Sequence, residues 1–231
     1  MVDGLPVLQT TKPRIWHMYR SMVGVGIVCG LAIVGVFELT RPIIERNKAE
    51  ALQQAIFQVL PEAKTSATFR FEPEGAAGNF EAAGADDDAR FLVYAGYDAD
   101  RRLVGLAVEA AGMGYQDLIR VLYGYSFDKD AIVGIRVLES KETPGLGDKI
   151  EKDPAFLENF RRLDVSLNDE LSEIVHPIVA VRHGKKEQPW EVDGITGATI
   201  SSVAIADMLN KSTAYWIPRI RRNLDDFEES G

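Results

Sequence analysis

Residues 193–202, with the sequence DGITGATISS, combine one carboxylate and four hydroxyl groups directly before a helical pattern. A phosphate carried by Thr199 would be stabilised there by the free amides and the positive dipole end of the following helix. Gly197 and Ala198 would leave that hydroxyl accessible to a modifying enzyme. The alternative is an ordinary helix start, in which a serine or threonine caps the helix and Asp193 shapes the loop. The stretch therefore predicts either a modified hydroxyl or a capping loop.

A second stretch, ESKETPGLGD at residues 139–148, follows the last of four expected strands. The Thr143–Pro144 pair favours an extended residue before a rigid one. Gly145 and Gly147 permit a positive φ and a close approach of the backbone to a ligand. A bare turn would have the same composition, so the stretch alone leaves both a ligand loop and a simple turn open.

The elements that must position these stretches follow from the apolar pattern. Runs rich in β-branched and aromatic residues, separated by acidic or glycine turns, predict antiparallel strands at 91–98, 103–110, 118–128 and 131–140. Helical spacing predicts helices at 45–60, 154–163 and 202–224, and a further strand is expected at 174–182. Residues 63–89 predict loop with short strands. Strands and helices are grouped and do not strictly alternate, which indicates an α+β domain with a mainly antiparallel sheet flanked by helices.

Composition and charge exclude several classes of protein. The chain is 46% hydrophobic and 26% charged, as in ordinary globular proteins. Its net charge of -9 gives no basic face for phosphate backbones, which excludes nucleic acid as a partner. The single cysteine, Cys29, excludes an internal disulfide and a multi-thiolate metal site within the chain.

The N-terminal part predicts one membrane helix. Residues 1–20 carry three basic residues and one acidic residue, a net charge of +2, and residues 21–37 are 17 consecutive uncharged residues. With Leu39 this run reaches the short end of what spans a bilayer core of ~30 Å. We therefore expect a cytoplasmic segment at 1–20, a membrane helix at 21–40, and an extracytoplasmic domain at 41–231 by the positive-inside rule, in the cytoplasmic (inner) membrane of the cell.

Four further features bear on this anchor. A cleaved secretory signal is the alternative, but the exit of the run lacks the small residues of a cleavage site. Arg41, Arg46 and Lys48, on the far flank, slightly weaken the expected orientation. The glycines of residues 24–30 imitate a dinucleotide fingerprint without a preceding strand, so we do not expect a nucleotide site. Gly26 and Gly30 have the spacing that allows a second membrane helix to approach closely.

Together, E-T-P-G-L-G at 142–147 and D-G-I-T-G-A-T at 193–199, behind one N-terminal anchor, resemble the covalent-flavin subunit of the Rnf ion-pumping electron-transport complexes. That family is also similar to the C subunit of the sodium-pumping NADH:quinone reductase. The resemblance implies FMN joined to Thr199 through a phosphodiester bond, which a separate flavin transferase forms. It also implies four recognition elements for the transferase and three alternative acceptor hydroxyls. The recognition elements are Asp193, Thr196, Gly197 and Ala198, and the alternative acceptors are Thr196, Ser201 and Ser202.

The same resemblance implies that the earlier loop lies near the flavin. Glu142, Thr143, Gly145 and Leu146 are the flavin contacts that it predicts. Residues 112–115 resemble a G-x-G-Y segment of the same domain, which is a weaker match.

The function implied by this family is electron carriage and not independent catalysis. A membrane complex would couple electron transfer between ferredoxin and NAD to translocation of Na⁺ or H⁺, with other membrane and peripheral subunits as partners. Residues 149–151 favour the Rnf member over the C subunit of the quinone reductase, which remains an alternative. Two further alternatives are an anchored scaffold protein without flavin and a free-standing anchored flavoprotein reductase.

Other residues carry weaker signals. Asp86, Asp87 and Asp88 favour a solvated turn over a cation site, because the spacing of a calcium loop is missing. His176 and His183 have no neighbouring ligands at a metal spacing, so we expect structural roles. Trp190 either covers the flavin ring or packs in the core beside the loop. Residues 219–222, with three arginines, complement the negative end of the last helix, and lipid binding is the alternative.

Overall fold

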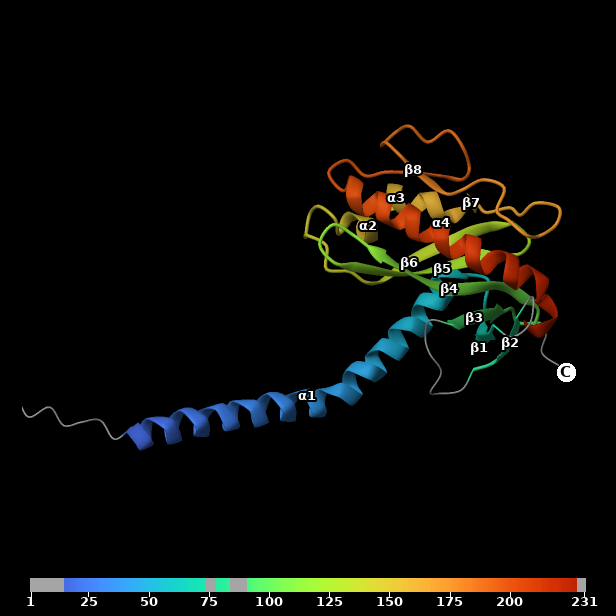
Figure 1. Ribbon diagram of the computed structural model, residues 1–231. Coiled ribbons are helices and arrows are strands. Elements are labelled where there is room, and N and C mark those ends of the chain that lie inside the picture. Colours follow the sequence, from blue (N-terminus) through green and yellow to red (C-terminus); the bar gives the residue numbers. More distant parts are fainter. Residues whose placement is uncertain (1–14, 74–77, 84–90, 228–231) are drawn as a thin grey trace, which may run out of the picture. The chain divides into compact units, whose positions relative to one another are not determined.

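The computed structural model describes residues 15–73, 78–83 and 91–227 of the protein (Figure 1). The aspartate triplet at 86–88 lies outside these described residues. The chain divides into two compact units, Met1–Ala49 and Glu50–Gly231.

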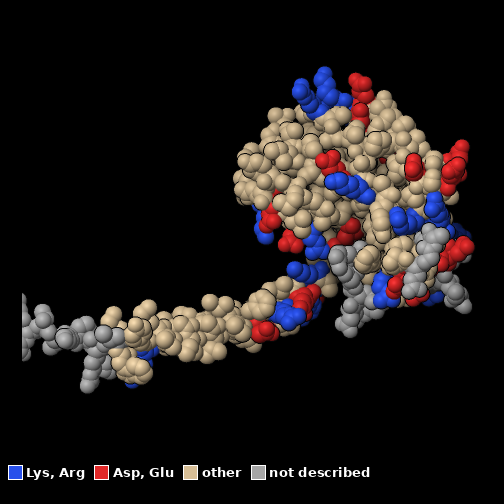
Figure 2. Space-filling view, viewed as in Figure 1, with Lys and Arg blue, Asp and Glu red and all other residues tan. Residues whose placement is uncertain are grey.

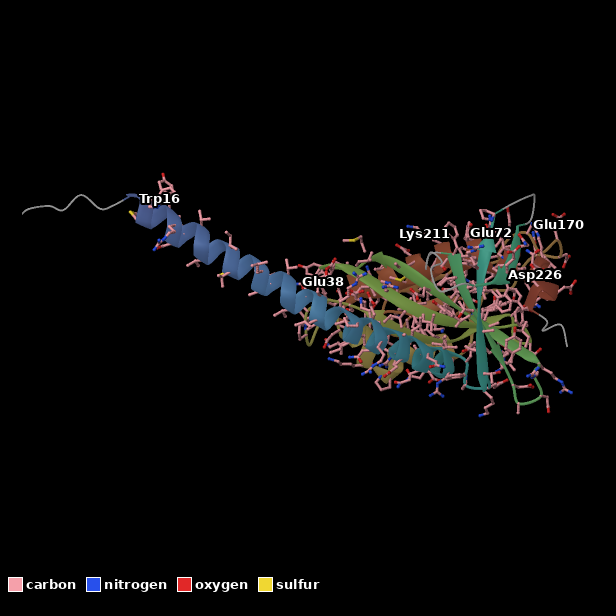
Figure 3. The ribbon with its side chains drawn as sticks, turned by 90° about the horizontal axis from the view of Figure 1, so that it is seen from below. Trp16, Glu38, Glu72, Glu170, Lys211 and Asp226 are labelled. Atoms are coloured by element: carbon pink, nitrogen blue, oxygen red, sulfur yellow. The ribbon has the colours of Figure 1, made fainter. Side chains whose placement is uncertain are left out.

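The first unit consists of most of the helix α1 (Ile15–Val59). Among the described residues, one helix, Met18–Val59, is long and apolar enough to cross a membrane. Its uncharged run appears as the tan stretch of the helix in Figure 2, and Trp16 and Glu38 lie on either side of that run (Figure 3). The apolar side chains between them are exposed, as expected for a surface that lipid covers.

The helix α1 differs from the expected pattern at Pro42. We expected a separate helix at 45–60, but Pro42 lies inside one continuous helix that ends at Val59. Proline removes a single backbone donor and clashes with the preceding turn, a cost that tens of helical residues around it are able to offset. The apolar stretch and the amphipathic stretch therefore belong to one helix.

The second unit is built on a seven-stranded sheet in the order β2-β1-β3-β4-β5-β6-β7, with every neighbouring pair antiparallel. The four strands expected from the sequence are all present, and each pairs with the next along the chain. They are β3 (Leu92–Tyr97), β4 (Leu103–Met113), β5 (Leu118–Ser126) and β6 (Ala131–Glu139). The predicted α+β class with a mainly antiparallel sheet is confirmed.

The strands at the edges of the sheet are indicated only weakly by the sequence. β1 (Thr65–Glu72) and β2 (Asn79–Ala82) form one edge, in the segment where we expected loop with short strands. Phe71 and Phe80 anchor this edge, because both side chains are buried and their ring centroids lie 5.0 Å apart. The other edge is the two-residue strand β7 (Leu163–Asp164).

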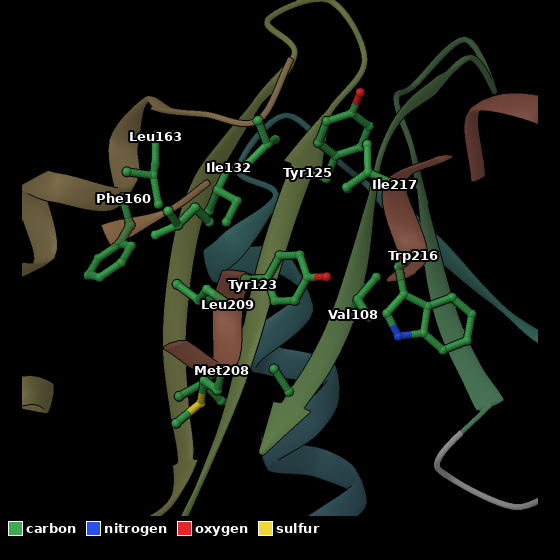
Figure 4. Packing of buried hydrophobic residues seen from close by; sticks show 14 of the residues in the cluster. Val108, Tyr123, Tyr125, Ile132, Phe160, Leu163, Met208, Leu209, Trp216 and Ile217 are labelled. Atoms are coloured by element: carbon green, nitrogen blue, oxygen red, sulfur yellow. The ribbon is translucent and has the colours of Figure 1, made fainter. Parts of the chain in front are cut away.

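One face of the sheet packs against α4 (Thr199–Arg222), which lies across β4, β5 and β6 in Figure 1. Alternate residues of the strands point to this face, as the pleat requires, and meet apolar residues of the helix. Figure 4 shows Val108 and Tyr123 on the strands beside Leu209 and Ile217 of α4. A short 3-10 helix, η3 (Leu224–Phe227), continues this core beyond α4.

The opposite face of the sheet is covered by residues 50–59, the last part of α1, which lies within the second unit. Val59 rests directly on the sheet. A Cβ on Gly124 would come within 2.3 Å of the Val59 carbonyl oxygen, so only glycine allows this approach. The helix end is therefore part of the second unit's core.

The segment between β6 and α4 is less regular than expected. We expected one helix at 154–163, but α3 (Pro154–Glu158) tightens into the 3-10 helix η2 (Asn159–Arg161) before β7 pairs with β6. A short helix α2 (Lys149–Lys152) precedes α3. The strand expected at 174–182 is reduced to β8 (Val179–Val181), which pairs in parallel with β9 (Glu191–Asp193). Pro177 lies inside that segment and cannot donate to a ladder, which accounts for the shorter strand.

Candidate functional site

Helix α4 begins three residues earlier than the sequence pattern predicts. Thr199 is its first residue, and Ala198 occupies the N-cap position with no side-chain hydrogen bond to the helix. The capping interpretation of the hydroxyl run is therefore wrong, because no serine or threonine occupies the N-cap. Ser202 is the first residue whose amide reaches a carbonyl four positions back, that of Ala198, at 2.9 Å. The amides of the first turn lack partners of that kind, as at any helix start.

The four hydroxyl groups of the motif differ in exposure. Thr196 and Thr199 are exposed, whereas Ser201 and Ser202 have relative exposures of 2% and 0%. The Ser201 hydroxyl donates to Oε2 of Glu142. The Ser202 hydroxyl donates to the Ala198 carbonyl oxygen at 2.9 Å and accepts the Ile195 amide at 3.1 Å. Both serines are thus engaged inside the fold.

Glu142 holds the loop of residues 142–147 against this helix start. Its side chain is buried, and Oε1 accepts the Gln116 amide at 3.0 Å while Oε2 accepts the Ser201 hydroxyl. A Cβ on Gly147 would come within 2.3 Å of Oε2, so glycine is required at that position. The loop, the 114–117 turn and the first turn of α4 therefore meet at one carboxylate.

The rest of this loop is a turn stabilised by Asp148. The Leu146 amide donates to the Thr143 carbonyl oxygen at 3.1 Å, and Gly145 has a φ of +79°. The Gly145 amide donates to Oδ1 of Asp148 at 2.6 Å, and Lys152 lies 2.7 Å from the other carboxylate oxygen. The Lys152 ammonium, and to a smaller extent the Gly145 amide, lowers the pKa of Asp148 below its ordinary value.

The two stretches singled out in the sequence come together around a cavity of about 310 Å³. Both stretches contribute lining residues, and Gly197, with a φ of +84°, brings its loop toward Leu146. Six of the nine predicted site residues line this cavity: Glu142, Thr143, Leu146, Gly197, Ala198 and Thr199. Gly145, Asp193 and Thr196 are not among its lining residues.

Asp193 has a different place from the one that the motif alone suggests. It ends β9, and its Oδ1 accepts the Gly184 amide at 2.7 Å, while Oδ2 lies 3.4 Å from Nδ1 of His183. The same histidine nitrogen lies 3.1 Å from the Gly194 carbonyl oxygen. Asn159 exchanges hydrogen bonds with the Asp193 backbone amide and carbonyl. Asp193 thus braces the base of the loop that presents Thr199.

The sequence reasoning missed part of the lining. Ile200 and Gly147 complete the cavity, and Ser201, expected only as an alternative acceptor, lines it as well. Tyr115 also lines it, which places the weakly matched 112–115 segment at the site. The structure, and not the sequence, identifies Ile200, whose apolar side chain is 56% exposed at the start of α4.

Trp190 and two arginines of residues 219–222, for which the sequence left two roles open, have contacts outside the cavity. Trp190 stacks on His176, with ring centroids 3.8 Å apart, and does not line the cavity. Two of the three arginines at the end of α4, Arg219 and Arg221, pack on the protein itself. The Arg219 guanidinium lies 3.8 Å from the centre of the Tyr215 ring. Arg221 bonds to Asp130 and to the backbone of the β5–β6 turn.

Comparison with known proteins identifies the family. The model of the FMN-binding domain family matches residues 114–214, a span that includes both stretches. The G subunit of an ion-translocating oxidoreductase complex from Methanosarcina acetivorans is 30% identical over 204 residues, which cover 87% of this chain and 94% of the relative. The chain belongs to this family of G subunits. The resemblance inferred from the two motifs is therefore confirmed.

A second relative of the family and two solved structures also match this chain. The G subunit of the corresponding complex from Haemophilus influenzae (strain Rd) is 26% identical over 86% of this chain and 89% of its own length. Among solved structures, the C subunit of the Na⁺-translocating NADH-quinone reductase from Parabacteroides distasonis has a TM-score of 0.58 at 20% identity, covering 83% of this chain and 98% of that chain. NqrC from Shewanella oneidensis has a TM-score of 0.54 at 18% identity, covering 80% of this chain and 100% of that chain. These structures share the fold.

Proposed function

We propose that this chain is the electron-carrying subunit of an ion-translocating oxidoreductase complex and carries FMN on Thr199 through a phosphodiester bond. One observation supports the acceptor most strongly. Among the four hydroxyl groups of the motif, that of Thr199 belongs to an exposed residue that also lines the cavity. Thr196 is exposed but lies outside the lining, and Ser201 and Ser202 are buried and hydrogen-bonded.

The residues around the cavity fit a flavin nucleotide. Tyr115, Leu146 and Ile200 offer exposed apolar surface to a planar ring system, and a volume of about 310 Å³ lies in the range of small-molecule sites. The first turn of α4 offers free amides and the positive end of the helix dipole to the phosphate. FMN, when bound, supplies one-electron and two-electron transfer that no side chain of this cavity provides.

Attachment requires a donor whose FMN phosphoryl group bears a leaving group. The Thr199 oxygen then forms the new bond to phosphorus, the bond to the leaving group breaks, and the hydroxyl proton passes to the transferase. Gly197 and Ala198 keep the approach to Thr199 free of large side chains, while Asp193 and Thr196 present the loop to the enzyme. A covalent tether prevents loss of the flavin to a compartment that has no cytoplasmic pool to replace it.

The complex would transfer electrons between ferredoxin and NAD and couple this transfer to the movement of Na⁺ or H⁺. This chain contributes the flavin, and its other membrane and peripheral partners supply the ion path and the nucleotide site. Membership of the G-subunit family and the exposed apolar run of α1 support this role. Assignment as the C subunit of the quinone reductase is less favoured, since its solved relatives match this chain in fold alone.

Removal of the acceptor tests the attachment. The T199A chain, expressed with the flavin transferase, should show no in-gel flavin fluorescence after denaturation and should have the mass of its amino acids alone. The S201A chain is a matched control that loses one hydroxyl outside the recognition elements and should remain fluorescent. A fluorescent T199A band would contradict the proposal and move the acceptor to another hydroxyl.

We also propose that the N-terminus is cytoplasmic and that the FMN-binding domain lies outside the cytoplasmic membrane. The +2 charge of residues 1–20 supports this orientation. Protease added to intact spheroplasts should then digest the domain, while a tag at the N-terminus is lost only after lysis. Protection of the domain in intact spheroplasts would reverse the orientation.

A further inference from the structure

Glu142 is a buried carboxylate in the wall of the cavity that Thr199 also lines. Its relative exposure is 6%, and a buried carboxylate is costly unless hydrogen bonds or opposite charges compensate it. Two donors reach it, the Gln116 amide at Oε1 and the Ser201 hydroxyl at Oε2. These donors belong to two segments that are far apart in the sequence, so the carboxylate joins three parts of the cavity wall.

The surroundings of Glu142 are shaped to keep the carboxylate in place. A Cβ on Gly114 would come within 2.5 Å of Oε1, and a Cβ on Gly147 within 2.3 Å of Oε2. The two glycines therefore bring the backbone against both oxygens. A side chain held on both sides and bonded at both oxygens has little freedom to move.

No cation within the described part of the chain forms an ion pair with Glu142. The two lysines closest to it in sequence that form ion pairs bind elsewhere: Lys141 lies 2.6 Å from a carboxylate oxygen of Asp117, and Lys152 lies 2.7 Å from one of Asp148. Glu142 is thus compensated by neutral donors and by the positive end of the α4 dipole. Its negative charge remains available to act on whatever occupies the cavity.

We propose that Glu142 is a positioning residue for the flavin, and that its negative charge keeps the reduction potential of the flavin low. This inference rests on the proposed attachment of FMN to Thr199. Electrons added to the flavin bring negative charge into a cavity that already has a fixed negative charge in its wall. Solvent screens a carboxylate that is only 6% exposed poorly, so the like charges repel. The hydrogen bond from Ser201 partly neutralises the carboxylate and weakens that repulsion.

The test compares two variants of the full chain, purified in detergent with its covalent flavin. E142Q keeps the shape of the side chain and removes its charge, so the midpoint potential of the flavin should become more positive. S201A keeps the charge and removes one donor, so the potential should become more negative. A purely structural role of Glu142 predicts that the midpoint potential shifts in the same direction in E142Q and in S201A, because both variants loosen the same contact.

The controls separate this inference from the attachment itself. In-gel fluorescence and intact mass establish that each chain carries the flavin, and a wild-type chain without flavin would refute the proposed function instead. E142D retains the charge and should move the potential less than E142Q does. Potentials of E142Q at or below the wild-type value would overturn the proposal. If E142Q does not fold, S201A decides alone, and an unchanged or more positive potential in S201A overturns it.

Discussion

The two ends of helix α4 are built differently. At its C-terminal end, the Arg221 side chain bonds to Asp130 and donates to the Phe127 carbonyl oxygen at 3.1 Å. The Asn223 amide closes the helix on the Ile220 carbonyl oxygen at 3.2 Å. At this end the helix is fixed by charge, by a cap and by the core beneath it.

At its N-terminal end the same helix has no side-chain cap, and its first two residues are exposed. Ala198 makes no capping bond, and the contacts at this end are hydrogen bonds of two buried hydroxyls, from Ser201 to Glu142 and from Ser202 to the Ala198 carbonyl oxygen. The comparison teaches that this helix gains its stability at one end and leaves the other end available for chemistry. Substitutions at the two ends should therefore have separable effects on stability and on the flavin.

The strongest test of this separation uses one residue type at both ends. Ile217 is fully buried against the sheet, and Ile200 is 56% exposed at the cavity. I217A should lower the free energy of unfolding by about 2–5 kcal/mol, because it leaves a cavity in the core. I200A should change it by less than about 0.5 kcal/mol. Denaturant unfolding of the full chain in detergent, followed by tryptophan fluorescence, measures both, and equal losses would contradict the comparison.

A second pair separates backbone strain from contact with the cavity. Gly197 and Gly145 both have a positive φ, +84° and +79°, but Gly197 lines the cavity and Gly145 does not. Alanine at either position should cost about 1 kcal/mol of stability through left-handed strain. G197A alone should also lower covalent flavin content, which in-gel fluorescence per mass of protein reports. Equal flavin loss in G145A would show that strain, and not the cavity wall, governs attachment.

The smallest expected effect is a pH-dependent change in stability at Asp148, which stabilises the loop facing the N-terminal end of α4. The pKa of Asp148 is lowered in the folded chain from its ordinary 3.8, chiefly by Lys152, so its contacts stabilise the fold above that value and lose this effect as pH falls through the folded pKa. D148N should therefore lower the melting temperature slightly at pH 7, and the difference from wild type should narrow as the pH falls below that ordinary value. A difference that does not depend on pH would mean that the charge of Asp148 is irrelevant to the loop.

Much of the second unit was predictable because its strands are separated by clear turns. The four central strands combine β-branched and aromatic residues with acidic or glycine breaks, so local pattern and final pairing agree. The continuation of α1 through Pro42 was not predictable, because a proline signal is local and the helix around it is long. The shortening of the strand at β8 follows from Pro177, whose missing backbone donor is evident from the sequence.

The sequence predicted which residues belong to the candidate site better than it predicted how they are arranged. Both motifs were recognisable by residue type, and six of nine predicted residues line one cavity. The burial of Glu142 and its bond to Ser201 join positions that are far apart in sequence, and no local pattern reports such a contact. The position of Asp193 away from the cavity was hidden for the same reason, since its partners lie in the loop after β8.

The order of elements along the chain also determines how long one face of the sheet stays uncovered during synthesis. The sheet is complete in its central strands at Glu139, but the helix that covers its apolar face begins only at Thr199. Until that last helix emerges, Val108, Tyr123 and their neighbours have no partner on that face and remain open to aggregation. Chains that terminate before α4 should therefore collect in the insoluble fraction.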